Sequence, residues 1–587
     1  MIYKIIPKSI IHIRLEHVIF LLFLVIVPQY IKRTYFSNFS FSGSFGINRL
    51  VIITIGVLIS AVIIWFGYKY IEKIVYEVNS RITPLIWIFG LFLFVAVPLS
   101  FMGGESSQAG RKADNISQDV SQFNAGASSK RPNFIFIIMD TLAARDMQLY
   151  GYKRPTTPFI SEWAKTAAVF NRAYAAANWT TPAAMSIMTG QRVWTHGVWH
   201  LIYYHPFENY DNNLPALLRD SGYDVYSFVQ NPFAHPDTLG IKDPFLLRDK
   251  AHTFWLPPEW WMDILKGFFL NKPVVKEWIF ERNVFAKKIN SFRPESHVTD
   301  VPPDIVYNKF LKFISERQRE KDKSQTPFFA WLHVFPPHDF YLPSEPYMGM
   351  FGDAEKYNSD KKQSEIEMLG SAYAPQLQPD VDILRKRYDE FVLYSDQQFK
   401  TFISGIAEKL DLSNTVIILL SDHGESFSHG WLAHKGTHLY ESLVHVPLII
   451  KLPGQAAGRT IDMKVEHTDV APTILELAGI SIPPWMEGRS LFPLLNGETM
   501  QSQPVFSMQF SNNPVIGSRH IDKGTVAVWD GDYKLINYLD NKKSLLFDLK
   551  NDPDENNDLY LSNPETAQRL LQLITDNIDR VNKRITH

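Results

Sequence analysis

Three pairs of polar residues lie at or just beyond the ends of apolar runs, and their residue types suit metal-assisted catalysis. In chain order, the pairs are Asp140 with Thr141, His333 with His338, and Asp422 with His423. Carboxylates and imidazoles are ligands of hard and borderline divalent cations, which leaves Zn²⁺, Mn²⁺, Mg²⁺ and Ca²⁺ as candidates. A lone Asp after a strand is more often a helix cap. The set together favours a metal site with Asp140, Asp422 and His423 as ligands.

Two adjacent threonines supply a candidate nucleophile. Thr180 and Thr181 precede Pro182, which can occupy the first turn of a helix running towards Gly190. A hydroxyl there meets the positive end of the helix dipole, and a coordinated cation would lower its pKa. We therefore predict that Thr180 is the nucleophile. The alternative is that Thr180 or Thr181 is an N-cap, and the sequence does not distinguish the two threonines.

Further titratable side chains are concentrated between His429 and Glu441, close in sequence to Asp422. His434 and Lys435 are the main catalytic candidates of this segment, together with His338 upstream. A single histidine is more often a surface or satisfied core residue than a catalyst. Their concentration beside a candidate metal site argues that some of them take part in the chemistry.

The apolar runs that precede these residues predict an α/β fold. Residues 133–139 form a continuous apolar run with β-branched residues, which is typical of a central parallel strand. Similar runs occupy residues 223–229, 328–334, 416–420 and 447–450, and helix-like stretches occupy residues 159–170 and 471–477. Alternating strands and helices predict a sheet covered by helices on both faces. Ligands bind beyond the carboxyl ends of strands in such sheets, where the polar pairs are expected.

Length and composition restrict the possible classes of protein. The chain has 587 residues, so two or more domains are expected. A formal net charge of -2, without a polybasic segment, argues against nucleic acid as a partner. The chain contains no cysteine, which excludes disulfides, thiolate zinc sites and a cysteine nucleophile.

The first 102 residues predict a membrane region of about three helices. Residues 17–31, 50–68 and 84–101 are apolar, and the flanking Lys and Arg residues place the amino terminus in the cytoplasm. A cleaved signal peptide is the less favoured alternative. Residues 103–130 then predict a flexible linker. Residues 131–587 are expected to form a catalytic domain outside the cytoplasm, at a bacterial-type inner membrane, with a smaller subdomain from about residue 500.

The motifs, taken in order, resemble those of a known family. They are Arg131-Pro132-Asn133, Asp140-Thr141-Leu142, Thr180-Thr181-Pro182 with Thr189-Gly190, Pro337-His338, Ser421-Asp422-His423-Gly424-Glu425 and Lys435-Gly436-Thr437. The chain after Arg131 resembles the sulfatase family of the alkaline phosphatase superfamily. The resemblance implies a divalent metal ion held by Asp140, Thr180, Asp422 and His423. It further implies that His338 and Lys435 contact the anion or the leaving group.

Three positions depart from the family pattern. Sulfatases place at position 180 a Cys or Ser that becomes formylglycine, and they place an Arg at position 184, where this chain has Thr180 and Ala184. Thr141 stands where many sulfatases have a second acidic ligand, which argues against a calcium site. Threonine cannot become formylglycine, but phosphothreonine can be relieved by in-line attack at phosphorus. The chain is in this respect similar to phosphoethanolamine and phosphoglycerol transferases and lipoteichoic acid synthases.

These features together predict phosphoryl transfer through a phosphothreonine at Thr180. A phospholipid is the expected donor, a glycan, a lipid or water the acceptor, and His338 or His434 is expected to protonate the leaving alcohol. Sulfate ester hydrolysis without formylglycine and a catalytically silent binding protein are the alternatives. The aromatic-rich residues 252–301 lie outside the resemblance. They could form an interfacial helix or lid, or an ordinary insertion packed on the core.

Overall fold

A computed structural model of the chain describes most of it from Arg131 onward. The described residues are 131–199, 210–250, 302–320, 325–339, 341, 343–352, 371–434, 436–510 and 520–585. The predicted membrane region and linker, the insertion at residues 252–301, and Lys435 lie outside these ranges. Among the described residues, no helix combines the length and the apolar character that a membrane span requires.

An eight-stranded sheet forms the centre of the chain from Arg131 onward, and its strand order is β11-β2-β10-β7-β1-β5-β3-β4. The strands are β1 (Asn133–Met139), β2 (Ala168–Tyr174), β3 (Asp224–Val229), β4 (Leu247–Lys250), β5 (Phe328–Val334), β7 (Thr415–Leu420), β10 (His445–Lys451) and β11 (Arg459–Glu466). All neighbouring pairs are parallel except those that β10 makes with β7 and β2. The prediction of a central parallel strand at residues 133–139 is confirmed.

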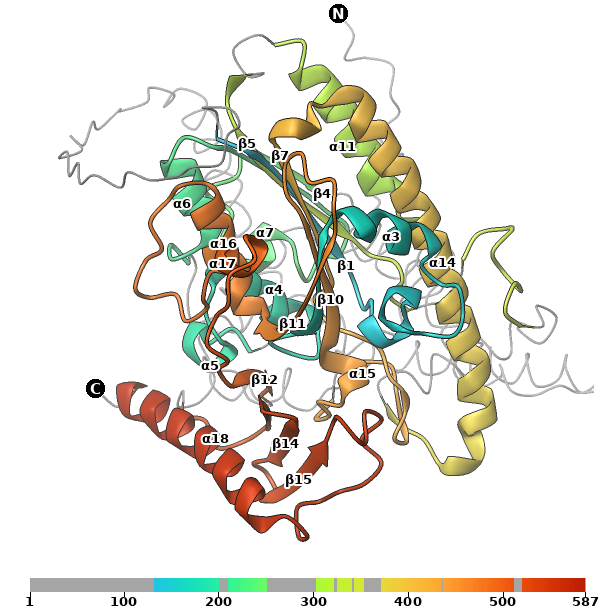
Figure 1. Ribbon diagram of the computed structural model, residues 1–587, viewed down its shortest axis with the longest axis vertical. Coiled ribbons are helices and arrows are strands. Elements are labelled where there is room, and N and C mark those ends of the chain that lie inside the picture. The colour runs from blue at the N-terminus through green and yellow to red at the C-terminus, as the bar shows by residue number, and fades with distance from the viewer. Residues whose placement is uncertain are drawn as a thin grey trace, which may run out of the picture. The chain divides into compact units, whose positions relative to one another are not determined.

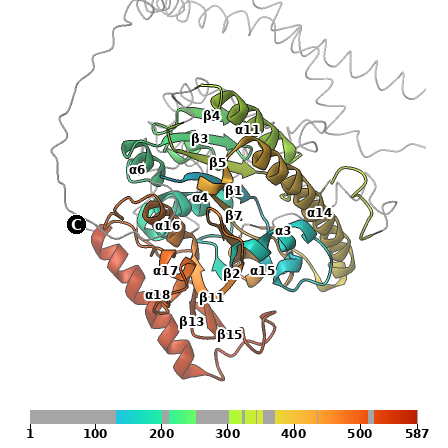
Figure 2. The ribbon, with the colours of Figure 1, turned by 45° about the horizontal axis from the view of Figure 1, so that its top comes forward.

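Alternate residues of β1 face two different hydrophobic cores. Ile135 and Ile137 pack in the core that contains residues of α11 (Asp304–Arg317) and α14 (Gln378–Lys409). Phe134 and Phe136 pack with α4 (Thr180–Thr189), α6 (Leu214–Asp220) and α16 (Val470–Leu477). The two groups of helices lie on opposite faces of the sheet (Figures 1 and 2). The predicted α/β sheet with helices on both faces is confirmed.

The prediction of a helix over residues 159–170 is wrong at its C-terminal end. Helix α3 (Pro158–Trp163) is followed by one 3-10 turn, and the strand β2 begins at Ala168. Ala168, Val169 and Phe170 pair with β10 on one side, and Ala168 also pairs with Arg459 of β11 on the other. Pairing partners almost 300 residues away thus override the local helical periodicity. The helix predicted at residues 471–477 is confirmed as α16.

The C-terminal part of the chain forms a second sheet covered by one helix. Its antiparallel strands are β12 (Val505–Gln509), β13 (Thr525–Asp530), β14 (Tyr533–Tyr538) and β15 (Lys543–Asp548). Helix α18 (Pro564–Ile585) packs Leu570 and Ile574 against Val526 and Leu535 of this sheet. The shorter elements are β6 (Ser371–Ala372), β8 (Phe427–Ser428), β9 (Trp431–Leu432), α5 (Val193–His196), α7 (Pro236–Leu239), α15 (Glu441–Val444) and α17 (Phe492–Leu495).

Strand register brings the polar pairs to one edge of the central sheet. Met139 of β1 pairs with Val334 of β5, and Ile138 pairs with Leu420 of β7. The residues that directly follow β1 and β7, and His333 near the end of β5, therefore meet at the carboxyl edge of the sheet.

Candidate active site

The candidate nucleophile lies at the first position of a buried helix. Trp179 is extended, with φ -164° and ψ 163°, and α4 begins at Thr180. The helix ends before Gly190, whose φ of 63° is in the left-handed region that glycine adopts without strain. Trp179 is the N-cap residue and makes no capping bond through its side chain. Thr180 is therefore not the N-cap, and its hydroxyl is available for another role.

Hydrogen bonds distinguish the two threonines that the sequence left equivalent. The Thr181 hydroxyl donates to the carbonyl oxygen of Phe233 at 3.0 Å, so it is engaged with the backbone. Thr180 Oγ1 instead accepts a hydrogen bond from Asn231 Nδ2 at 3.2 Å and lies 3.4 Å from His423 Nε2. Thr180 is the threonine that the structure directs towards the predicted metal ligands.

Asp140, Asp422 and His423 converge beside Thr180 and are all fully buried. Asp422 Oδ1 accepts the N–H groups of His423 and Thr141 at 3.0 Å and 3.3 Å. Asp422 Oδ2 and Asp140 Oδ1 accept no hydrogen bond within the described residues. His423 Nδ1 lies 3.0 Å from the Gly424 carbonyl oxygen and must donate to it, which in a neutral imidazole leaves Nε2 unprotonated.

These three atoms face one another, and no hydrogen bond joins either carboxylate oxygen to a partner within the described residues. His423 Nε2 lies 3.5 Å from Asp140 Oδ1 and 3.7 Å from Asp422 Oδ2. Buried acceptors that are left unpaired are unfavourable, and a bound cation would satisfy all three at once. The backbone bond to His423 Nδ1 also fixes its tautomer, as is common for metal-ligating histidines. The donor set therefore fits a divalent metal ion.

The electrostatics of the Asp140 and Asp422 carboxylates also favour a bound cation. Burial and the neighbouring Asp422 carboxylate raise the pKa of Asp140. Burial also opposes ionisation of Asp422, but the imidazoles of His423 and His333 outweigh it and lower the pKa of Asp422. Two carboxylates so close in a buried site compete for one proton, and a bound cation removes that conflict.

Asn231 is a site residue that the sequence analysis missed. It lies two residues after β3, and its Nδ2 donates to Asp140 Oδ2 and to Thr180 Oγ1. Its own Oδ1 accepts the N–H of Phe233 at 2.9 Å, which fixes the orientation of the amide. Asn231 therefore holds a predicted metal ligand and the predicted nucleophile together. The signal was present, because Asn231 follows an apolar run just as Asp140 and Asp422 do.

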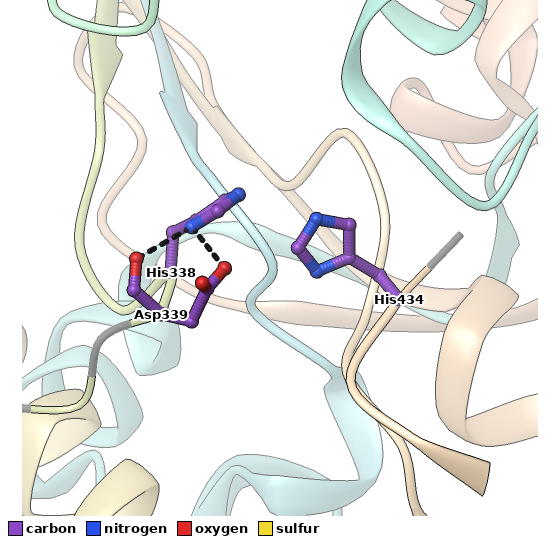
Figure 3. A group of neighbouring side chains, drawn as sticks. All are labelled: His338, Asp339 and His434. Atoms are coloured by element: carbon purple, nitrogen blue, oxygen red, sulfur yellow. Dashed lines mark hydrogen bonds and ion pairs between the residues drawn. The ribbon is translucent and has the colours of Figure 1, made fainter. Parts of the chain in front are cut away.

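His338 and His434 lie opposite each other (Figure 3), with ring centroids 4.5 Å apart. His338 Nδ1 lies 2.7 Å from Asp339 Oδ1 and 2.8 Å from the Asp339 carbonyl oxygen. His434 Nδ1 bonds to the fully buried Glu425, at 3.1 Å and 3.2 Å from its two oxygens. The His434 ring also lies 4.7 Å from that of His423, which connects the pair to the predicted metal ligands.

His338 is suited to donate a proton near neutral pH. Burial lowers its pKa, but the carboxylates of Asp339 and Asp140 outweigh this effect and raise the pKa of His338 to about 8. The imidazole is then mostly protonated at pH 7. Because Nδ1 is engaged by Asp339, Nε2 is the atom that can serve a leaving group.

The other residues that the sequence singled out either lie away from the predicted metal ligands or contribute no side-chain hydrogen bond to the site. His429 Nε2 bonds to the Asp554 carbonyl oxygen at 3.0 Å, and its ring stacks on Tyr440, so it belongs to the contact with the C-terminal subdomain. Ala184 is fully buried inside α4. Thr141 has a φ of 61°, which is strained for a β-branched residue. Its hydroxyl makes no hydrogen bond within the described residues.

Comparison with known proteins gives matches that cover the whole site. A family model described as Sulfatase matches residues 132–480, and one described as N-sulphoglucosamine sulphohydrolase, C-terminal, matches residues 427–584. The choline-sulfatase of Rhizobium meliloti (strain 1021) is 25% identical over 450 residues, which is 72% of this chain and 81% of the relative. The N-acetylglucosamine-6-O-sulfatase of Bacteroides thetaiotaomicron is 22% identical over 527 residues, 76% of this chain and 86% of the relative.

Solved structures share the fold. The phosphonate monoester hydrolase of Agrobacterium radiobacter superimposes with a TM-score of 0.58 at 18% identity, over 77% of this chain and 96% of that chain. A structure of the protein BT4656 with its substrate D-glucosamine-2-N,6-O-disulfate gives a TM-score of 0.57 at 18% identity, over 77% of this chain and 99% of the other. The residues matched by the first family model include Thr180, Asn231 and all three predicted metal ligands.

Proposed function

The chain belongs to the sulfatase family of ester hydrolases, and on that premise we propose that it cleaves a phosphodiester through a covalent phosphothreonine at Thr180. The observation that carries the proposal is the hydroxyl of Thr180, directed at the metal ligands where the family places its formylglycine precursor. A divalent cation held by Asp140, Asp422 and His423 would lower the pKa of that hydroxyl and offset the charge of the phosphoryl group.

The chemistry of threonine favours phosphorus over sulfur as the reacting centre. A formylglycine hydrate carries a second hydroxyl that expels sulfate, whereas a sulfated threonine has no such exit. A phosphothreonine is open to in-line attack at phosphorus by water or another hydroxyl. Sulfate ester hydrolysis is the second candidate, and the sulfatases among the relatives favour it.

The residues around Thr180 have separate proposed roles in the two steps, which are formation and breakdown of the phosphothreonine. Asn231 donates to Thr180 Oγ1 and thereby holds the attacking oxygen in place. Thr180 attacks as the alkoxide, after its hydroxyl proton has passed to solvent. As the bond from Oγ1 to phosphorus forms and the bond from phosphorus to the leaving alcohol breaks, His338 gives its proton to the leaving oxygen. In the second step the acceptor hydroxyl attacks phosphorus, His338 takes the acceptor's proton, and the bond from phosphorus to Oγ1 breaks, which restores the Thr180 alkoxide. His434 and Lys435 are proposed to contact the leaving or transferred group.

The proposal extends to the surroundings of the enzyme. The apolar runs in residues 1–102 support a membrane-anchored chain whose catalytic domain lies outside the cytoplasm. A phospholipid head group would then be within reach as donor, and a glycan or a second lipid as acceptor.

A substrate screen of the full-length protein tests the proposal. Its arms are an aryl sulfate, a soluble aryl phosphodiester, and vesicles of lipids with phosphoethanolamine or phosphoglycerol head groups. We expect kcat/KM for the phosphodiester to exceed that for the aryl sulfate by roughly 100-fold or more, and we expect release from the vesicle lipids. Faster turnover of the aryl sulfate would favour the second candidate instead. Turnover of the soluble ester alone would remove the lipid donor.

Replacing Asp339 by Asn tests the role of His338 through pH dependence. His338 must be protonated to act, so activity should fall as pH rises through about 8. Asp339→Asn removes a carboxylate that raises this pKa, so the alkaline limb of kcat/KM should move to lower pH while the metal content stays unchanged. An alkaline limb that does not move would show that another group donates the proton.

A further inference from the structure

His333 is a buried histidine with an unusual lack of hydrogen bonds. It lies on β5 between Ile138 of β1 and Val229 of β3, and it is fully buried. Neither of its ring nitrogens has a hydrogen-bond partner within the described residues. A neutral imidazole carries one donor and one acceptor, so this burial is unfavourable unless another partner satisfies the ring.

The ring is directed at the two carboxylates of the site. His333 Nε2 lies 3.6 Å from Asp422 Oδ2, which itself accepts no hydrogen bond within the described part of the chain. One ligand atom each of Asp140, His333 and Asp422 lies within 4.8 Å of the other two, and all three residues are buried. The three residues converge from the ends of three neighbouring strands of the central sheet.

We propose that His333 is a second imidazole ligand of the metal ion, so that the protein binds it through two carboxylates and two imidazoles. The donors are Asp140, Asp422, His423 and His333, with Thr180 beside them. The inference rests on the metal ion of the proposed function, but it does not depend on whether the substrate is a phosphate or a sulfate ester.

The residue at position 141 supports this donor set, because a threonine there leaves a place for another ligand. Many sulfatases have an acidic ligand where this chain has Thr141, so a negative charge is missing from the site. Thr141 contributes only its backbone N–H, which donates to Asp422 Oδ1 at 3.3 Å. A neutral imidazole from His333 restores the number of ligands but not the charge. It replaces a hard oxygen donor with nitrogen.

The consequence is a change of metal preference. Ca²⁺ takes six to eight oxygen ligands, whereas Zn²⁺ and similar borderline ions accept imidazole readily. Two imidazoles and two carboxylates therefore select Zn²⁺ or a neighbouring first-row ion over Ca²⁺. The expected preference for Zn²⁺ over Ca²⁺ distinguishes the protein from calcium-dependent arylsulfatases, and it follows from the two imidazoles of His333 and His423.

Metal titration of the full-length protein tests the inference. The protein is stripped with a chelator and titrated with Zn²⁺ and with Ca²⁺, as wild type and as His333→Asn. We expect one ion per chain, tighter binding of Zn²⁺ than of Ca²⁺, and a loss of Zn²⁺ affinity on the order of 100-fold in the variant. His445→Asn is the matched control, because its Nε2 bonds to the Asn171 carbonyl oxygen away from the site. That variant should bind Zn²⁺ as the wild type does.

X-ray absorption of the zinc-loaded wild-type protein gives a second readout that needs no variant. Imidazole rings produce characteristic outer-shell scattering, and two rings per zinc are expected. A single ring, or an unchanged Zn²⁺ affinity in His333→Asn, would overturn the inference. That result would leave His333 as a neighbour of Asp422 rather than a ligand of the metal ion. Failure to turn over a phosphodiester would leave both metal readouts unaffected, so the two proposals can fail separately.

Discussion

Thr180→Ala should reduce turnover by at least about a thousandfold and abolish the covalent adduct. The adduct is detected by rapid acid quench of the full-length protein with an aryl phosphodiester, followed by peptide mass spectrometry. In the wild type we expect the mass of one phosphoryl group on the peptide that contains Thr180. The reason is geometric, since Thr180 Oγ1 is the only threonine hydroxyl of the pair that faces His423 and Asn231.

Thr181→Ala is the matched control for this experiment. Its hydroxyl donates to the Phe233 carbonyl oxygen, so its loss should cost stability of about 1 kcal/mol and leave the adduct in place. Thr180→Ser keeps a hydroxyl but loses the methyl group that restricts χ1, and it should retain turnover within roughly tenfold of wild type. An adduct that persists in Thr180→Ala, or disappears in Thr181→Ala, would rule out Thr180 as the nucleophile.

Much of the site could be predicted because strand ends are local features of the sequence. An apolar run such as residues 133–139 marks a buried strand, and the next residue, Asp140, must lie at its carboxyl end. Parallel strands bring such ends together whatever their separation in the chain. Asp140, Asp422 and His423 could therefore be grouped without knowing which strands are neighbours.

The features that sequence reasoning missed depend on pairings across the fold. The first three residues of β2, residues 168–170, were read as helix because the partner strand β10 lies far along the chain. The choice between Thr180 and Thr181 required the position of Phe233, which the sequence does not place. Asn231 and His333 followed the same strand-end rule as Asp140. The rule was not applied to amides. His333 stayed without an assigned role because its nearest carboxylate, that of Asp422, follows a different strand, β7.

The two histidines that we propose to act on the leaving group illustrate the same limit. His338 and His434 could be named from their motifs, but their chemistry is set by carboxylates. Asp339 is adjacent to His338 in sequence, so its contact with His338 could have been suspected. Glu425 and His434 instead lie on either side of the hairpin formed by β8 and β9, which brings them together. Asp339 helps to raise the pKa of His338. The pKa of His338 is thus set by one carboxylate that is adjacent in sequence and by a second, that of Asp140, which only the fold brings close.

Asp140→Asn should affect stability and activity in opposite directions. In the metal-free protein, burial and Asp422 disfavour the charge of Asp140 and raise its pKa, so a neutral amide should relieve the conflict. The amide oxygen can still accept from Asn231, and the amide N–H would face the lone pair of His423 Nε2, 3.5 Å from the present oxygen. We expect the melting temperature of the metal-free variant to rise, on the order of 1–2 °C.

The same substitution removes a charged ligand of the proposed metal ion. Turnover should therefore fall by at least about a thousandfold, and added Zn²⁺ should no longer raise the melting temperature as it does for the wild type. Asp146→Asn is the contrasting control, because Asp146 is equally buried but pairs with Arg385 away from the site. It should lower the melting temperature and leave zinc binding intact. If Asp140→Asn instead destabilised the metal-free protein as Asp146→Asn does, the two site carboxylates would not be in conflict, and the electrostatic argument for a cation between them would fail.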